Sequence, residues 1–292
     1  MRMAEYKNID VSGMKPFASG NTAECYRLDD DKILKLYFDE SKTAFLEKEK
    51  QNALSLLKNY IPAPISYELV TSGDKVGIIY EMIDGKSVSE TITADGSQAA
   101  PLGRKVAALA REIHSHEDTD GLFRESTFFV RRSVGDLTYV SDKAKQRMLE
   151  VTDSLNGYIN FVHGDFHPNN ILVQDDGLYV IDLYGFSHGC PAFDVATILF
   201  SFYWSPEAFQ GTNTFNGLSL KQRNDFWNAF RDEYFGPDNK DILELLPAVL
   251  LLKRMNFEQF SGPRFSEEYC RSIREDVIKV FEEGKPCPPL TI

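Results

Sequence analysis

The chain has 292 residues, 42% hydrophobic and 26% charged, which is ordinary globular composition and excludes a disordered or collagen-like protein. Its formal net charge of −12 argues against nucleic acid as the main partner. No apolar run approaches the roughly 20 residues that span a bilayer. The start, MRMAEYKNID, lacks an apolar signal region, so we expect a cytoplasmic protein with no membrane partner, monomeric by default. The 4 cysteines form no CxxC pair, which favours reduced thiols over disulfides or a zinc site.

The first 83 residues read mostly as strands. β-rich runs at 17–28 and 32–38 flank a DDD turn and predict a hairpin, and two more strands are expected within 61–70 and 75–83. Between these pairs, residues 41–60 have helical spacing, with Ser41 as the expected N-cap. The expected apolar stripe of this helix consists of Phe45, Leu46, Ala53, Leu54, Leu56 and Leu57.

After a break at IDGKS, residues 83–87, helical patterns dominate. The exception is a short hairpin in the middle, in which ILV and LYVIDL flank the turn QDDG. The expected helices lie within residues 102–116, 141–155, 219–236, 240–260 and 264–284. The sequence therefore predicts an α+β chain with a small β-rich lobe, residues 1–83, and a larger helical lobe, residues 84–292.

The segment HGDFHPNN, residues 163–170, is a polar loop that runs directly into the apolar strand ILV. Buried polar groups must find partners or bind something. Since a hairpin brings its open ends together, Asp182 at the end of LYVID should return close to Asn170. A carboxylate and an amide oxygen are hard ligands suited to Mg²⁺ beside a phosphate. Asp165 remains nearby as a carboxylate for chemistry.

This pattern, HxDxHxxN followed by a strand, a turn and ID, resembles the catalytic loop and metal-ligand segment of the aminoglycoside phosphotransferase family. These are small-molecule kinases with a protein-kinase-like bilobal fold, related to choline and homoserine kinases. The resemblance continues through GFSHGCPAFDVA, which ends near Asp194, and spans about residues 15–200. It implies that Asp165 is the catalytic base and that Asn170 and Asp182 hold Mg²⁺. Apart from the resemblance, His163 and His167 could be metal ligands, but we favour rings that bond loop backbone. Asp194 is expected to cap a helix and to bond backbone N–H groups of the loop.

The β-rich lobe carries further parts of the resemblance. ILKLY resembles the strand of the phosphate-binding lysine, here Lys35, and LEKEK resembles the helix of its ion-pair partner, Glu49, with Glu47 as the less favoured choice. IIYEMIDG resembles the hinge that contacts the nucleotide base through backbone groups near Glu81 and Ile83. The loop over the phosphates is poor in glycine, and the residues implied there are Ser19, Asn21 and Thr22.

The implied function is transfer of the γ-phosphate of ATP or GTP to a hydroxyl of a small acceptor. Residues 1–83 carry 11 basic and 13 acidic residues, a net of −2, so the remaining residues carry −10. This charge suits a cationic acceptor such as an aminoglycoside or an amino alcohol, while a sugar stays open. The acidic residues considered for contact are Glu207, Asp225, Asp232, Glu233 and Glu258.

Three alternatives remain. GDFH also resembles part of metallophosphoesterase signatures, but the further His and Asp ligands of a two-metal site are missing. A catalytically inactive nucleotide-binding module is a second alternative, although such modules typically lose the lysine, the base or the metal aspartate. A protein kinase is the third, but neither the glycine triplet nor an activation segment is present.

Overall fold

The structure is a computed structural model that describes residues 6–20, 22–38, 43–205, 214–215, 217–236, 240–261, 265–288 and 290. The chain divides into two compact units. The first unit comprises Met1–Lys86 and Ile171–Tyr184, and the second comprises Ser87–Asn170 and Gly185–Ile292. The sequence-based division after residue 83, which assigned the central hairpin to the helical part, stays a proposal for the functional lobes.

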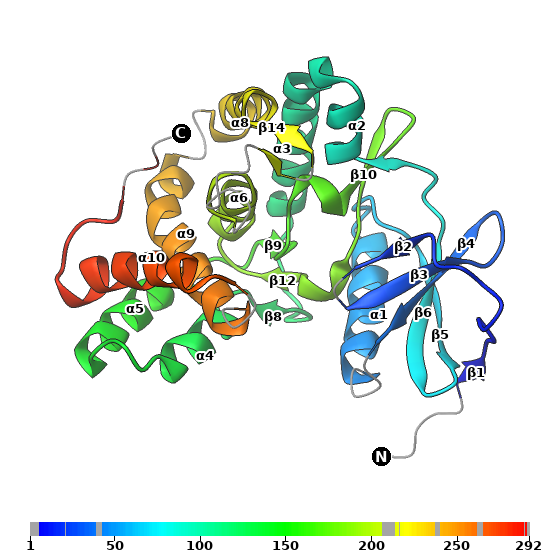
Figure 1. The fold of residues 1–292 in the computed structure, drawn as a ribbon, viewed down its shortest axis with the longest axis horizontal. Helices are drawn as coiled ribbons and strands as arrows, with labels where there is room; N and C mark the ends of the chain where they lie inside the picture. The colour runs from blue at the N-terminus through cyan, green and yellow to red at the C-terminus, as the bar shows by residue number, and fades with distance from the viewer. Residues whose placement is uncertain are drawn as a thin grey trace. The chain divides into compact units, whose positions relative to one another are not determined.

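The first unit is built on a six-stranded sheet with the strand order β1-β5-β6-β4-β3-β2 (Figure 1). All its neighbouring strands pair antiparallel except β1 and β5, which are parallel. The strands are β1 Lys7–Asn8, β2 Ala18–Ser19, β3 Ala23–Arg27, β4 Lys32–Tyr37, β5 Ser66–Ser72 and β6 Lys75–Glu81. The expected hairpins are therefore confirmed, and the DDD turn joins β3 to β4.

Side chains of strand β4 alternate between the two faces of the sheet. Leu34 and Leu36 are buried in a cluster with Val70 and Ile79. Lys35 lies between these leucines and so points to the opposite face, toward helix α1, Thr43–Lys58. The alternation places a lysine on the helix-covered face of the sheet.

The buried face of α1 differs from the expected apolar stripe. Glu49, Asn52, Ala53 and Leu56 are buried at helical spacing, with at most 2% exposure. Leu54 and Leu57, which belonged to the expected stripe, are 41% and 48% exposed, so this part of the prediction was wrong. The pattern misled because two polar residues occupy the buried face and two leucines point outward. Ser41, the expected N-cap, lies outside the described residues.

The central hairpin belongs to the first unit. Strand β10, Ile171–Gln174, pairs antiparallel with β11, Gly177–Val180, in the register Ile171↔Val180. The hairpin is tied to the rest of the unit by a hydrogen bond from the Val180 N–H to the Pro62 carbonyl at 2.9 Å.

The second unit is mainly helical, with α3 packed along α8 and α9 packed against α6, α4 and α10. Its helices are α2 Val88–Ala94, α3 Ala99–Ser115, α4 Phe128–Asp136, α5 Asp142–Ser154, α6 Ala192–Leu199, α8 Leu220–Phe235, α9 Lys240–Ser261 and α10 Glu267–Val277. Its short strands are β8 Arg124–Glu125, β9 Phe161–Val162, β12 Ser187–His188, β13 Thr214–Phe215 and β14 Leu218–Ser219, while β7 Lys86–Ser87 spans the boundary between the units.

All five expected helices are present in this unit, and three of them begin at serine caps. Ser141, Ser219 and Ser266 each accept a hydrogen bond from a backbone N–H in the first turn of α5, α8 and α10. The short helices α2, α4 and α6 did not stand out by periodicity. None of the described helices is long and apolar enough to cross a membrane. The 4 cysteines are free, as expected.

Candidate active site

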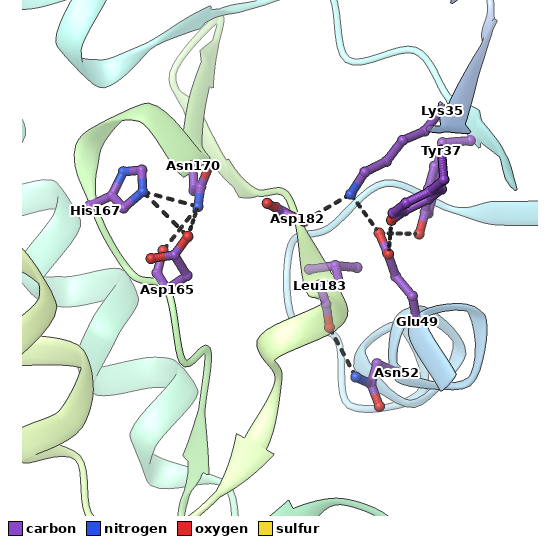
Figure 2. A network of polar contacts seen from close by, with 10 residues as sticks. Lys35, Tyr37, Glu49, Asn52, Asp165, His167, Asn170, Asp182 and Leu183 are labelled. Carbon is purple, nitrogen blue, oxygen red and sulfur yellow. Dashed lines mark hydrogen bonds and ion pairs between the residues drawn. The ribbon is translucent and has the colours of Figure 1, made fainter. Parts of the chain in front are cut away.

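Lys35 is the centre of a polar network in the first unit. Its ammonium donates to Oε1 of Glu49 at 2.9 Å and to Oδ1 of Asp182 at 2.8 Å (Figure 2). The side chains of Lys35 and Glu49 are only 14% and 2% exposed, whereas that of Asp182 is 45% exposed. Burial by itself would lower the pKa of Lys35, but the two carboxylates outweigh it and raise this pKa well above its ordinary value. Lys35 is therefore a fixed positive charge.

Two tyrosine hydroxyls hold the Glu49 carboxylate in place. Tyr37, two residues after Lys35 on β4, donates to Oε2, and Tyr80 on β6 donates to Oε1 at 2.9 Å. Burial and the neighbouring Glu49 carboxylate raise the pKa of both tyrosines, so both remain donors. The alternative partner of Lys35, Glu47, instead accepts a hydrogen bond from Tyr6 at 3.0 Å. The structure thus pairs Lys35 with Glu49.

Asp182 is presented by an unusual backbone. Its φ is +64°, in the left-handed region that few non-glycine residues adopt, although aspartate tolerates it better than most. The next residue, Leu183, is anchored to α1 because its carbonyl accepts from the Asn52 side chain at 2.9 Å (Figure 2). The helix that supplies Glu49 therefore also fixes the segment that supplies Asp182.

The polar loop forms a separate network in the second unit. The Asn170 amide donates to both the backbone carbonyl and Oδ2 of Asp165, each at 3.0 Å (Figure 2). Nε2 of His167 lies 3.5 Å from the same Oδ2. The Asp165 side chain is 52% exposed and so remains open to an incoming group. The Asp165 carboxylate is therefore exposed but oriented by two neighbours, Asn170 and His167.

The charge state of Asp165 follows from this setting. Burial by the loop would raise the pKa of its carboxyl, but His167, followed by Lys253 and His163, outweighs this and holds the pKa well below its usual range. Asp165 is a carboxylate at neutral pH, and a weak base. Such a carboxylate can orient a hydroxyl group by accepting its hydrogen bond, but its affinity for a proton is low.

Asp194 pins the start of the polar loop. Although wholly buried, its carboxylate accepts the backbone N–H of His163 at 2.7 Å and that of Gly164 at 2.8 Å. This is the contact expected of Asp194, but the residue does not cap a helix. The N-cap of α6 is Pro191, and Asp194 lies in the first turn.

His114 supports Asp194 from helix α3. Its Nε2 lies 3.1 Å from Oδ2 of Asp194, and its Nδ1 lies 2.8 Å from the Tyr234 hydroxyl. Burial opposes ionisation of Asp194, but the bond from His114 lowers its pKa below the ordinary value. This role of His114 could not be predicted from the sequence, because a histidine in an apolar helix is more often an ordinary core residue.

The two histidines of the polar loop, His163 and His167, bond to loop backbone, as expected. Nδ1 of His163 accepts from the Asp165 N–H, and Nδ1 of His167 accepts from the Asn169 N–H, each at 3.3 Å. Both rings therefore shape the polar loop.

Each unit carries one predicted ligand for Mg²⁺, the Asp182 carboxylate in the first unit and the Asn170 amide in the second. Within the described part of the chain, no three His, Cys, Asp or Glu side chains gather to enclose a metal ion. Magnesium in phosphate-transferring enzymes is usually held by one or two protein oxygens together with substrate phosphates. The Asp182 carboxylate, which is 45% exposed, is an oxygen ligand of that kind.

The remaining predicted residues of the nucleotide site have mixed surroundings. Ser19 and Thr22 are exposed near the tip of the β2–β3 turn, and Asn21 lies outside the described residues. The Glu81 N–H donates to the Ile65 carbonyl, and its side chain accepts from the Ile65 N–H. The Ile83 carbonyl accepts from Gly85.

Among the described residues, none of the acidic side chains considered for the acceptor makes a hydrogen bond or ion pair with Asp165. Asp232 and Glu233 are exposed on α8, where Asp232 pairs with Arg231 at 2.8 Å. Asp225 pairs with Lys221, and Glu258 is buried against Arg274. Glu207 lies outside the described residues.

Comparison with known proteins gives a consistent result. A sequence model described as the phosphotransferase enzyme family (APH) matches residues 13–227. No curated protein matches the sequence. The solved structures that resemble this one include amicoumacin kinase hAmiN in complex with AMP-PNP, Ca²⁺ and Ami, with a TM-score of 0.63 and 15% identity, over 98% of this chain and 92% of that one.

Two aminoglycoside phosphotransferases are similar in the same way. ADP-bound APH(2'')-Ib has a TM-score of 0.58 and 16% identity, over 92% of this chain and 93% of that one. APH(3'')-Id from Streptomyces rimosus, in complex with ADP and streptomycin, has a TM-score of 0.55 and 16% identity, over 82% and 92%. At such identities the likeness is one of fold, which is that of the protein-kinase-like small-molecule kinases.

The match to the sequence model makes this protein a phosphotransferase. The match over residues 13–227 covers most of the sequence, so the chain belongs to the phosphotransferase enzyme family. The expected fold class, family and enzyme class are thereby confirmed.

Proposed function

We propose that the protein transfers the γ-phosphate of ATP or GTP to a hydroxyl of a small, cationic acceptor. The observation that carries the proposal is the ion pair of Lys35 with Glu49 and Asp182, in a family member that also has Asp165 and Asn170 in the polar loop. A chain that had lost catalysis would have no reason to keep all five.

Lys35 is proposed to hold the α- and β-phosphates. Its charge is fixed by Glu49, which the hydroxyls of Tyr37 and Tyr80 hold in turn. Phosphoryl transfer has a loose transition state, so positioning and charge stabilisation provide most of the rate. The exposed carboxylate of Asp182 is then free to change partners when a phosphate takes its place on Lys35. Ser19, Asn21 and Thr22 are proposed to lie along the phosphates, and backbone groups near Glu81 and Ile83 to contact the base.

Asp182 and Asn170 are proposed as the protein ligands of Mg²⁺, which when bound supplies charge neutralisation between phosphate oxygens. Chain connectivity supports this pairing. Asn170 directly precedes Ile171, and Ile171 pairs with Val180, two residues before Asp182.

Asp165 is proposed to accept a hydrogen bond from the acceptor hydroxyl and to take its proton late. Asn170 and His167 orient its carboxylate, and its low pKa keeps it ionised. His163 and Asp194 are proposed to act through the loop backbone that they bond.

The acceptor is proposed to carry amino groups, because the net charge of residues 84–292 is −10. Two similar solved structures are complexes with streptomycin and with kanamycin, which agrees with such an acceptor. Glu207, Asp232 and Glu233 are retained as proposed contacts. Coupled measurement of ATP and GTP consumption with Mg²⁺ against aminoglycosides, amino alcohols, sugars and nucleosides would identify the class. Nucleotide binding without consumption across the panel would instead favour the inactive module.

Replacement of Asp165 by Asn tests the proposed base. We expect kcat to fall about 10²- to 10⁴-fold, as for other positioned acid–base groups, while nucleotide affinity stays unchanged. The measurement is steady-state kinetics with the acceptor from the panel, together with nucleotide titration. Asp74→Asn, in the exposed β5–β6 turn, is the control. Near-normal turnover of the Asp165 variant would overturn the assignment.

A further inference from the structure

Lys253 lies on helix α9 and reaches the polar loop from outside it. Its ammonium donates to the backbone carbonyl of Gly164 at 3.2 Å. Gly164 directly precedes Asp165, the proposed base. The contact joins the longest helix described in the second unit to the peptide that presents the reacting carboxylate.

Lys253 carries a charged group next to an apolar stretch of α9. The turn of α9 before it is apolar, and Val249, Leu250, Leu251 and Leu252 are all at most 4% exposed. Burial lowers the pKa of Lys253, against the opposing effect of the Asp165 and Asp194 carboxylates. Lys253 itself is partly buried, and a hydrophobic side chain at this position would carry no desolvation cost.

The peptide between Gly164 and Asp165 is held at both ends. Its carbonyl accepts from Lys253, and its N–H donates to Nδ1 of His163 at 3.3 Å. Gly164 itself has a φ of +85°, and its own N–H is bound by Asp194. A peptide plane that is bonded on both sides is restrained from rotating, and it fixes the N–Cα bond of Asp165 from which the side chain departs.

We propose that Lys253 is a positioning residue for phosphoryl transfer: by holding the Gly164 carbonyl it fixes the peptide that aims the Asp165 carboxylate at the acceptor hydroxyl. The positive charge of Lys253 also acts on Asp165 from the side of α9. The inference rests on the proposed function, since it assigns Lys253 to the reaction that Asp165 serves.

The proposal predicts a loss in turnover without a loss in nucleotide binding. In Lys253→Met, which keeps the length of the side chain but not the donor, kcat should fall about 10- to 100-fold, because misplacement by about 1 Å has effects of this size. The KM for the nucleotide should stay within about twofold, because Lys35, which is proposed to bind it, is unaltered. Lys253→Arg, which keeps a charged donor, should recover a substantial part of the lost rate.

The full chain is tested with MgATP, by phosphate release when water is the acceptor and by transfer to the acceptor from the panel. Amide hydrogen exchange of residues 163–166 gives a readout that needs no activity, and it should become faster in Lys253→Met. The matched control is Lys145→Met, since Lys145 also donates to a glycine carbonyl, that of Gly135 at 3.4 Å, on an exposed surface. That variant should match the wild type in both readouts.

Turnover of Lys253→Met within about twofold of the wild type, or unchanged exchange of residues 163–166, would overturn the inference. A loss of rate that follows only from lower thermal stability, and disappears when the assay is run well below the melting temperature of the variant, would also overturn it. Asp165→Asn keeps the two proposals apart. If that variant stays active, the assignment of Asp165 as the base fails, whereas a dead Asp165 variant beside a fully active Lys253 variant rejects only the role of Lys253.

Discussion

At the scale of single residues, the Glu49 carboxylate accepts three hydrogen bonds from side chains of the first unit. It receives hydrogen bonds from Lys35, Tyr37 and Tyr80 at one buried position. Hydrogen bonds to a buried charge are stronger than those between neutral groups, and an unpaired partner is costly. Glu49 thus links the stability of the sheet to the position of the Lys35 ammonium.

Replacement of Glu49 by Gln should therefore affect both stability and nucleotide use. The amide keeps an acceptor for the tyrosines but removes the charge, so we expect unfolding to become easier by about 3 kcal/mol at most, since Asp182 still pairs with Lys35. The KM for the nucleotide should rise about tenfold, because Lys35 loses its fixed position. Denaturant unfolding and steady-state kinetics measure the two effects.

Glu47→Gln is the matched control, because Glu47 lies two residues away on the same helix and its side chain accepts from Tyr6 instead of Lys35. It should change neither property beyond about twofold in KM or about 0.5 kcal/mol in stability. Equal effects of the two substitutions would contradict the assignment of Glu49 as the partner of Lys35.

At the scale of elements, helix α1 and the polar loop place the proposed site residues. The face of α1 carries Glu49 toward Lys35 and Asn52 toward the Leu183 carbonyl. The polar loop is bonded directly by Asp194 on α6 and Lys253 on α9, and His114 on α3 bonds Asp194. Each unit thus brings its polar residues together by packing elements that are far apart in the sequence.

The turn at Gly164 is an element-scale feature that tolerates no side chain. A Cβ at this position would lie 2.3 Å from the Gly185 carbonyl oxygen, and φ is +85°. Gly164→Ala should therefore cost about 2 kcal/mol or more and lower kcat strongly, because the strained backbone and the clash both displace the loop. Thermal unfolding and kinetics measure the outcome.

Gly157→Ala provides the comparison, because a Cβ there would meet nothing within 4 Å and its φ is not in the left-handed range. Its stability should stay within about 1 kcal/mol of the wild type. A Gly164 variant as stable and active as this control would show that the loop is not held as tightly as the contacts indicate.

At the scale of the whole molecule, the buried Asp194 makes stability depend on pH. Its folded-state pKa lies below the ordinary value of about 4, so its contribution is fully present above that pH and is lost as pH falls through the folded pKa. Removal of the hydrogen bond from His114 should raise that folded pKa, because burial then acts with less opposition. The acid-unfolding midpoint of His114→Gln should therefore move to higher pH.

Circular dichroism at stepwise pH between about 2 and 6 detects the shift, a range that brackets ordinary carboxyl pKa values. His116→Gln, two residues away at the end of the same helix and stacked on Phe161, serves as the control and should keep the wild-type midpoint. Identical midpoints for all three proteins would mean that Asp194 does not depend on His114.

Particular elements show how far sequence reasoning reached. Helices with long periodic patterns and serine caps, such as α5 and α8, were predicted close to their bounds. Helix α2 was missed although its start, SVSE, holds a capping box in which Ser87 and Glu90 bond each other's backbone, a signal present in the sequence. Helix α4 has only 9 residues and α6 only 8, too few for periodicity to separate them from loops.

The sequence by itself determined the family and the order of the proposed site residues, because a phosphotransfer site needs a lysine, carboxylates and an asparagine at characteristic spacings along the chain. Only the tertiary structure decided which residues support them. Tyr37 and Tyr80 bond to Glu49, His114 bonds to Asp194, and Lys253 bonds to the polar loop, through contacts across 12 to 89 positions of sequence. Such partners have no fixed spacing, since they are selected by the packing of helices and sheet and not by local pattern.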